Sequence, residues 1–409
     1  MSTAARPLST PITPDLVRGA PELEATPVGV RAHRLPAWAV AQAADPRLAM
    51  AESQPSGVRL RFATDATALE LRAHATRFRY RGAPPRPFGV FDLVVDGRLT
   101  GQASVDTATV VNIDMATGAR EITHADAGGV LFDPLPAGTK RVEIWLPHNE
   151  TIELLELRSD APVVPLEEDR PVWLHHGSSI SQGSNALHPT GIWPVVAATH
   201  GGVDLLNLGF GGSALLDPFV ARTIRDTPAQ VISLKLGINV VNADLMRKRA
   251  FGSAVHGFLD TIRDGHPQTP LLVVSPILCP IHEHTPGPGA FDLDALARGE
   301  LRFRATGDPE GVDQGQLTLT VVREELARIV AERSAEDRFL SYLDGRELYG
   351  AADAEELPLP DDLHPGAEAH LRIGRRFADI AFGAGASLVA RPEADTEWPA
   401  PPEVTRAVS

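Results

Sequence analysis

Apolar and polar residues alternate through much of the chain between Val28 and Asp160. The alternation is clearest in four segments: Val58–Phe62, Leu69–Ala73, Phe91–Val95 and Val142–Leu146. A period of two is typical of strands that bury one face. Asp96-Gly97 follows one of these segments and strongly indicates a hairpin turn. No helical run of useful length interrupts them, so the pattern predicts an antiparallel β-sandwich of jelly-roll type over residues 28–165.

The pattern changes beyond the proline-bearing, charged segment Ala161–Arg170, which is interpreted as a linker. Short apolar runs now alternate with helical stretches. The predicted strands are 172–175, 203–208, 230–236, 271–277 and 339–343, and the predicted helices are 192–200, 218–226, 245–264, 317–333 and 367–381. Strands that are apolar throughout and alternate with helices indicate a parallel sheet covered on both faces. The sequence thus predicts a three-layer α/β/α domain over residues 171–390.

The remaining segments are expected to carry less structure. Residues 1–27 are rich in Pro, Thr and Ala and are predicted to form a loose arm or an early edge strand. Residues 391–409 are predicted to be a frayed tail. The stretch from Leu278 to Gln316 is rich in Pro and Gly and shows little regular pattern, so it is either a lid over a site or a surface insertion.

Composition narrows the class of protein. The 409 residues carry a formal net charge of -15, spread along the chain, which argues against nucleic acid or an anionic membrane as a partner. No apolar run approaches the roughly 20 residues of a membrane span, and the first residues lack the apolar core of a secretory signal. A cytoplasmic location is therefore expected. The single cysteine, Cys279, excludes an internal disulfide framework.

Candidate chemistry gathers where the predicted strands of the second domain end. Gly177-Ser178-Ser179-Ile180 follows the first strand, and Gly209-Phe210-Gly211-Gly212 follows the second. Gly237-Ile238-Asn239 follows the third strand, and Asp361-Asp362-Leu363-His364 precedes the last helix. Open α/β sheets bind their ligands at this edge. Ser179 is a candidate nucleophile with His364 as its base, and Asp361 can orient the imidazole.

The glycine-rich turns and the asparagine supply candidate groups for a negative oxygen. The Ser179 N–H, the Gly212 N–H and the Asn239 side chain could together hold the oxyanion of a tetrahedral intermediate. Each motif alone is also compatible with ordinary turn or capping chemistry. Their joint order and spacing favour acyl transfer, a reaction that needs neither a metal nor an organic cofactor.

These motifs resemble the SGNH hydrolase superfamily of GDSL-type esterases and lipases. The family's first block is usually Gly-Asp-Ser-Ile; here Ser179 matches the nucleophile and Ser178 stands at the usual Asp position. Gly212 matches the oxyanion glycine, Asn239 the block asparagine, and Asp361 with His364 the final Asp-x-x-His. The resemblance covers about Val172 to Ala381 and implies a flavodoxin-like α/β/α fold. Some carbohydrate esterases and acyltransferases of this superfamily also carry an N-terminal β-sandwich.

Other polar residues have weaker claims to a role. His176 and Trp193 are candidate pocket residues beside the nucleophile turn, whereas His175 is interpreted as a packed strand end. His282 and His284 lack a matching ligand set, so no metal site is predicted. Cys279 is interpreted as a buried apolar residue.

The leading functional hypothesis is a serine esterase that hydrolyses small O-acyl esters, such as those of a sugar or a natural product. An O-acyltransferase that uses the same acyl-enzyme remains an alternative, as does a catalytically degenerate glycan-binding protein. The expected partners are a small-molecule ester or an acylated glycan, and formation of a homo-oligomer is left open. The sandwich is either a contributor to the site or a scaffold.

Overall fold

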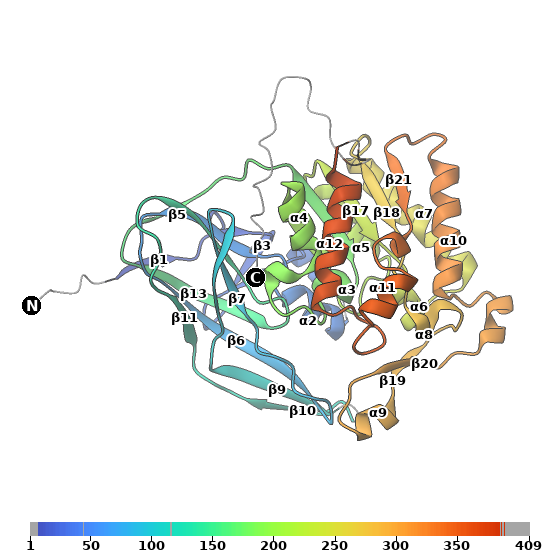
Figure 1. Cartoon of the computed structure of the whole chain (residues 1–409), viewed down its shortest axis with the longest axis horizontal. Helices are drawn as coiled ribbons and strands as arrows, with labels where there is room; N and C mark the ends of the chain where they lie inside the picture. The colour runs from blue at the N-terminus through green and yellow to red at the C-terminus, as the bar shows by residue number, and fades with distance from the viewer. Residues whose placement is uncertain (1–6, 44, 115–116, 385, 387, 389–409) are drawn as a thin grey trace, which may run out of the picture.

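A computed structural model describes residues 7–43, 45–114, 117–384, 386 and 388 as two domains packed side by side (Figure 1). The β-rich domain comes first in the chain, and the α/β domain follows it. The predicted tail at 391–409 lies outside the described residues, as do residues 1–6 of the predicted arm. No helix among the described residues is long and apolar enough to cross a membrane.

The first domain is the expected β-sandwich, built from an eight-stranded and a six-stranded sheet among the described residues. The larger sheet contains β1 (Leu8–Pro11), β3 (Glu22–Ala25), β4 (Val30–His33), β6 (Leu69–Arg81), β9 (Ala108–Asp114), β10 (Arg120–Thr123), β11 (Gly128–Phe132) and β13 (Thr151–Ser159). The smaller sheet contains β2 (Val17–Arg18), β5 (Arg59–Thr64), β7 (Phe91–Val95), β8 (Arg98–Ala103), β12 (Lys140–Trp145) and β14 (Val163–Pro165). Apolar side chains from both sheets form one core.

The hairpin predicted at Asp96-Gly97 is confirmed. It joins β7 to β8, with Val95 paired to Arg98. Asp96 and Gly97 have φ angles of 49° and 78°. Two positive φ angles suit the tight turn whose twist matches that of paired strands.

The sandwich departs from the sequence prediction in three respects. The described part of residues 1–27, predicted as a loose arm or an early edge strand, does form the edge strand β3 but also forms β1 and β2. Two helices, α1 (Ala37–Gln42) and α2 (Pro46–Ser53), interrupt a region predicted to lack them. Arg59 and Arg61 lie on the face of β5 expected to meet solvent, yet they are 1% and 7% exposed. That face is covered because the second domain packs near it.

The second domain contains the predicted parallel sheet. Its strands are β15 (Val172–Gly177), β16 (Asp204–Gly209), β17 (Val231–Lys235), β18 (Leu271–Val274) and β21 (Leu340–Leu343). Their order is β16-β15-β17-β18-β21. This is the flavodoxin-like order: β16 is added on one side of the first strand, β15, and all later strands are added on the other side. All five predicted strands are confirmed within a few residues.

Helices cover both faces of this sheet (Figure 1). The longer helices are α4 (Trp193–Gly201), α5 (Pro218–Asp226), α7 (Lys248–Gly265), α10 (Leu319–Arg333) and α12 (Ala367–Phe382), which match the five predicted helices. Outside residues 278–316, the shorter helices of the described part of the domain are α3 (Ser179–Gln182), η1 (Pro189–Gly191), α6 (Ile238–Asn242), η3 (Gly345–Glu347) and α11 (Ala351–Glu356). On one face Trp173 packs against Trp193 of α4 and Phe377 of α12, and on the other His176 stacks on Phe258 of α7. Alternate residues of β15 therefore anchor opposite helical layers.

The segment from Leu278 to Gln316 is more regular than its sequence indicates. It contains α8 (Pro280–Glu283), β19 (Gly289–Phe291), α9 (Leu293–Ala297), β20 (Phe303–Ala305) and η2 (Pro309–Gln314). Strands β19 and β20 pair with each other in a separate two-stranded sheet. Such short elements carry too few residues to show a period in the sequence.

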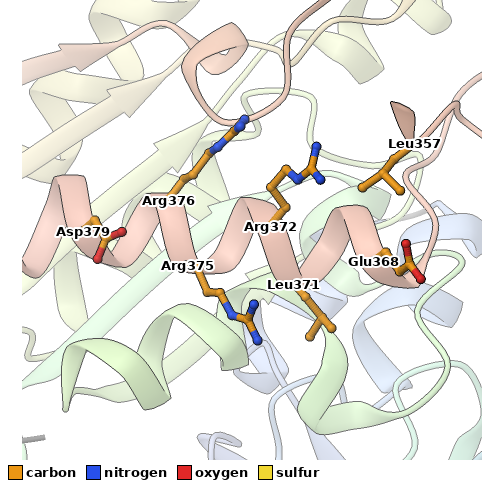
Figure 2. Close-up of a pocket in the computed structure, with 7 residues that line it drawn as sticks. All are labelled: Leu357, Glu368, Leu371, Arg372, Arg375, Arg376 and Asp379. Carbon is orange, nitrogen blue, oxygen red and sulfur yellow. The ribbon is translucent and has the colours of Figure 1, made fainter. Parts of the chain in front are cut away.

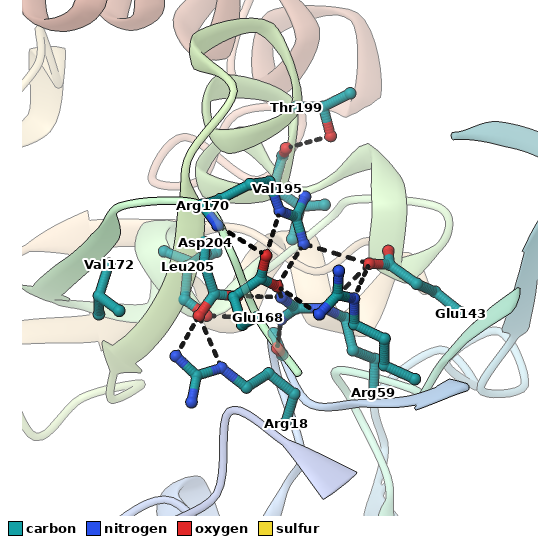
Figure 3. A network of polar contacts seen from close by, with 12 residues as sticks. Arg18, Arg59, Glu143, Glu168, Arg170, Val172, Val195, Thr199, Asp204 and Leu205 are labelled. Carbon is teal, nitrogen blue, oxygen red and sulfur yellow. Dashed lines mark hydrogen bonds and ion pairs between the residues drawn. The ribbon is translucent and has the colours of Figure 1, made fainter. Parts of the chain in front are cut away.

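A buried network of charges joins the two domains (Figure 3). Asp204, the first residue of β16, is fully buried and accepts hydrogen bonds from Arg18 and Arg59 of the sandwich. Glu168 and Arg170, in the predicted linker, pair with each other at 2.7 Å, and Arg170 also pairs with Glu143. The linker is therefore part of the domain interface, and its strand β14 extends the smaller sheet of the sandwich.

Candidate active site

Ser179 stands at the end of β15, where the chain turns sharply into α3. Ser178 is the residue before this helix and has extended backbone angles of -86° and -163°. Gly177 is required because a Cβ atom at this position would clash with Ser181 Oγ. The short helix ends at Gly183, whose φ is 112°, a conformation that favours glycine. The turn thus raises a half-buried Ser179 at the carboxyl edge of the sheet.

The structure brings Ser179, His364 and Asp361 together in a hydrogen-bonded chain. Ser179 Oγ lies 2.9 Å from His364 Nε2, and His364 Nδ1 lies 2.8 Å from Asp361 Oδ2. A carboxylate can only accept, so Nδ1 carries the proton and Nε2 of the neutral ring is free to accept from the serine hydroxyl. This tautomer is the one that can take a proton from a nucleophile.

Asp361 is held ionised by its surroundings. Burial alone would raise the pKa of its carboxyl group, but hydrogen bonds and charge from His364 outweigh burial and lower that pKa. Oδ1 also accepts the backbone N–H groups of Leu363 and His364, at 3.1 and 2.7 Å. Every hydrogen bond to the charged form favours ionisation.

Sequence reasoning missed Asn185. Its Nδ2 donates to Asp361 Oδ2 at 3.1 Å, the same oxygen that accepts the His364 ring proton. Asn185 has a φ of 67°, a conformation that asparagine tolerates better than most residues. The only sequence signal was an asparagine in a loop shortly after the nucleophile turn, and such a loop residue has many ordinary explanations.

The three predicted oxyanion donors come from neighbouring strand ends. The Ser179 N–H and the Gly212 N–H have no hydrogen-bond acceptor among the described residues. Asn239 Oδ1 accepts the N–H of Ala214 at 3.1 Å, which links the end of β17 to the loop after β16. The NH2 group of Asn239 stays available as a donor. A Cβ atom on Gly211 would lie 3.6 Å from Ser179 Cβ, so this loop borders the serine closely.

Ser178, which stands where the family usually has Asp, does not brace the turn. Its Oγ is buried without a hydrogen-bond partner among the described residues. Other groups hold the turn instead: Asn207 Nδ2 donates to the Ser181 carbonyl at 3.0 Å, and Ser181 Oγ lies 2.8 Å from His175 Nε2. His175 is fully buried, as predicted for a packed strand end.

Two predicted pocket residues lie in the core instead. His176 is 1% exposed, and its ring stacks on Phe258. Trp193 is fully buried between Trp173, His175 and Phe377. Both predictions were wrong because closeness in sequence to the nucleophile does not show which face of the sheet a side chain joins. Phe303 of β20 lies nearer the site, with its ring edge-on to His364 at 5.6 Å between centroids.

The segment from Leu278 to Gln316 thus borders the loop that carries Asp361 and His364. Besides Phe303, Arg302 pairs with Asp362 at 3.2 Å. Cys279 is buried, with burial raising the pKa of its thiol to about 12, and Glu283 is engaged by Arg323. No group of three metal-ligating side chains was found among the described residues.

A hollow of about 320 Å³ lies along α12 (Figure 2). It is lined by Leu357, Glu368, Leu371, Arg372, Arg375, Arg376 and Asp379. Arg372 and Arg376 are already paired with Asp353 and Glu356. None of the predicted site residues borders this hollow.

A flavodoxin-like sheet with a Ser–His–Asp chain at its carboxyl edge defines a serine enzyme that acts on esters. The comparisons agree: residues 169–280 match the sequence model of the GDSL-like Lipase/Acylhydrolase family. The α/β domain thus carries the match to GDSL-type hydrolases, and a β-sandwich domain precedes it. Together with the intact Ser–His–Asp chain, this match argues against the non-catalytic glycan-binding alternative.

Solved structures resemble the chain across both domains. One is the salicylyl-acyltransferase SsfX3 from a tetracycline biosynthetic pathway, with 28% identity and a TM-score of 0.73 over 91% of this chain and 95% of that one. A GDSL-like lipase from Bacteroides ovatus has 17% identity and a TM-score of 0.61, covering 88% and 93%. A family two carbohydrate esterase from Clostridium thermocellum has 13% identity and a TM-score of 0.56, covering 88% and 97%. No curated protein sequence matched the chain.

Proposed function

We propose that this protein is a serine esterase that hydrolyses small O-acyl esters through an acyl-enzyme on Ser179. The observation that carries the proposal is the hydrogen-bonded chain from Ser179 through His364 to Asp361. The same three residue types perform acyl transfer on several unrelated folds when they stand in this arrangement.

In the proposed reaction Ser179 Oγ attacks the ester carbonyl while His364 Nε2 takes the hydroxyl proton. Asp361 stabilises the imidazolium that results, and the lowered pKa of its carboxyl group keeps it ionised for this task. His364 then gives its proton to the departing alcohol, which leaves an acyl group on Ser179. Water attacks that ester with His364 again as the base, and the acid is released.

The developing negative oxygen needs donors fixed before the reaction begins. We assign this role to the N–H groups of Ser179 and Gly212 and to the Asn239 amide. Each such donor lowers a barrier by about 2.7–4 kcal/mol in a measured oxyanion hole. The bond from Ala214 N–H to Asn239 Oδ1 supports the assignment because it fixes the amide in one orientation.

A second candidate is transfer of the acyl group to an alcohol instead of water. The likeness to an acyltransferase over both domains, at 28% identity, favours it. The two reactions share the acyl-enzyme and differ in which nucleophile reaches it. Product partition between hydrolysis and transfer, measured with an aryl ester and a panel of alcohols, distinguishes them.

The proposal is tested by Ser179→Ala with its neighbour Ser178→Ala as the matched control. Ser179→Ala should lower kcat on a short-chain aryl ester by at least about a thousandfold. It should also abolish covalent labelling by a fluorophosphonate, seen as a loss of added mass on the intact protein. Ser178→Ala should stay within about threefold of wild type because the Ser178 hydroxyl has no partner among the described residues. Full turnover by Ser179→Ala would exclude this nucleophile.

A further inference from the structure

The amino-terminal domain reaches the loop that carries Gly212. Gln54 follows α2 and is 6% exposed, and Gln182 ends α3 and is 7% exposed. Gln182 Nε2 donates to Gln54 Oε1 at 2.5 Å, and Gln182 Oε1 accepts the Gly211 N–H at 2.7 Å. Gln54 Nε2 in turn donates to the Asn149 carbonyl at 3.3 Å. Two side-chain amides therefore connect the sandwich to the residue before Gly212.

The direction of this amide chain is fixed at both ends by backbone groups. The Gly211 N–H can only donate, so Gln182 must present its oxygen there and its NH2 group to Gln54. The Asn149 carbonyl can only accept, so Gln54 must present its NH2 group there and its oxygen to Gln182. The two requirements agree. Because both amides are buried, flipping either one would leave a donor facing a donor at one end and an acceptor facing an acceptor at the other.

Other residues of the sandwich hold the same strand end. Ser56 donates to the Gln182 carbonyl at 2.6 Å and accepts from Asn207 Nδ2 at 3.0 Å. Arg34 is fully buried and donates to the carbonyls of Asn207 and Gly209, at 3.0 and 2.7 Å. Its guanidinium also lies 4.9 Å from the centre of the Phe210 ring. The amino-terminal domain thus contacts Gly209 and Phe210 directly and Gly211 through Gln182.

We propose that the amino-terminal domain positions the loop from Gly209 to Gly212, here called the oxyanion loop. Gln54 is the positioning residue: it holds Gln182, and Gln182 holds the N–H of Gly211. The inference rests on the proposed function, because it assigns the Gly212 N–H to the oxyanion. Gly212 has a φ of 71° and no atom within 4 Å of the place of a Cβ, so little else in the structure restrains it on that side. The chain of amides supplies the restraint one residue earlier. A donor displaced by a fraction of an ångström loses much of its effect on the transition state.

The test uses the full-length protein and two substitutions that keep side-chain volume, Gln54→Met and Gln182→Met. Each should lower kcat on a short-chain aryl ester by about tenfold, a part of the effect of losing one oxyanion donor, with KM within twofold. The decisive measurement is the double variant. If Gln54 acts through Gln182, Gln54→Met should change kcat by less than twofold when Gln182 is already Met.

The matched control is Arg18→Gln, which removes a domain contact at the opposite end of the same strand, at Asp204. It should lower the melting temperature while kcat stays within twofold. Equal kcat in wild type and Gln54→Met, at equal folded fraction, would overturn the inference, as would independent effects in the double variant. If Ser179→Ala were active, the proposed function itself would fail. The inference alone fails if Ser179→Ala is inactive but Gln54→Met is unimpaired.

Discussion

At the scale of single residues, the geometry of the candidate site depends on how many hydrogen bonds hold each polar side chain. Asp361 uses both oxygens, accepting two backbone N–H groups, the His364 ring and the Asn185 amide. The carboxylate is therefore held in one orientation, which in turn orients the imidazole toward Ser179. Asn185 is the member of this set that the chemistry does not require, so its contribution can be measured separately.

Asn185→Gly should lower kcat by about tenfold with KM nearly unchanged, because a hydrogen bond to a charged acceptor contributes about 1.5–3 kcal/mol. Glycine is chosen because Asn185 has a φ of 67°, where alanine would add backbone strain. Steady-state kinetics and a melting curve provide the measurement. An unchanged kcat would show that His364 and the backbone amides orient Asp361 without help.

The residues that the sequence identified and those it missed differ in a physical way. Ser179, His364 and Asp361 lie in short motifs at strand and helix ends, where local chain geometry already determines their placement. Asn185 and Gln54 reach the site only through packing between loops and between domains. No local pattern records such contacts, and the same limit explains why His176 and Trp193 were wrongly expected at the pocket.

At the scale of elements, the long apolar strands and helices of the second domain were predictable because burial on both faces imposes a continuous apolar run. The short elements between Leu278 and Gln316 were not, since each spans only a few residues. Strand β5 shows a third case. Its alternation was real, but the arginines on its polar face are buried because the second domain supplies a partner for Arg59 and the linker supplies partners for Arg61.

Asp204→Asn tests how much this buried charge pairing stabilises β16. Arg59 is 1% exposed, and removing the charge of Asp204 takes away its nearest partner and leaves Glu143 and Glu168, each 3.7 Å away. The free energy of unfolding should fall by about 3 kcal/mol, the lower end for a broken buried pair, measured by urea unfolding. The kcat of the folded enzyme should stay within about twofold, because Asp204 lies at the end of the strand opposite the catalytic loops.

Asp169→Asn is the control for this substitution. Asp169 pairs with Arg61 at 3.6 Å, but its side chain is 70% exposed. Exposed pairs of this kind contribute about 0–1 kcal/mol. Equal losses in the two variants would contradict the assignment of the stabilisation to burial.

At the scale of the whole molecule, buried histidines predict how stability depends on pH. Burial is the main cause that lowers the pKa of His148 to about 3 and the pKa values of His176 and His370 to about 4. These pKa values lie below the roughly 6.5 of an unfolded histidine. As the pH falls below 6.5 the unfolded chain takes up protons before the folded chain does, so acid should destabilise the fold between pH 6.5 and about 4.

His176→Phe isolates one member of this group. The ring of His176 already packs against Phe210 and Phe258, so phenylalanine keeps the apolar packing. Phenylalanine gives up the bond from Nδ1 to the Leu208 carbonyl, at 2.7 Å, at every pH, so the slope with pH is the quantity compared. Each buried histidine contributes up to about 1.4 kcal/mol per pH unit in this range, and the substitution should make the fall in unfolding free energy shallower by up to that amount. Urea unfolding at several values between pH 4.5 and 6.5 measures the slope.

His284→Gln, at an exposed position, should leave the slope unchanged. A slope equal to wild type in His176→Phe would mean that His176 takes up a proton as readily in the folded protein as in the unfolded chain, which would contradict the prediction.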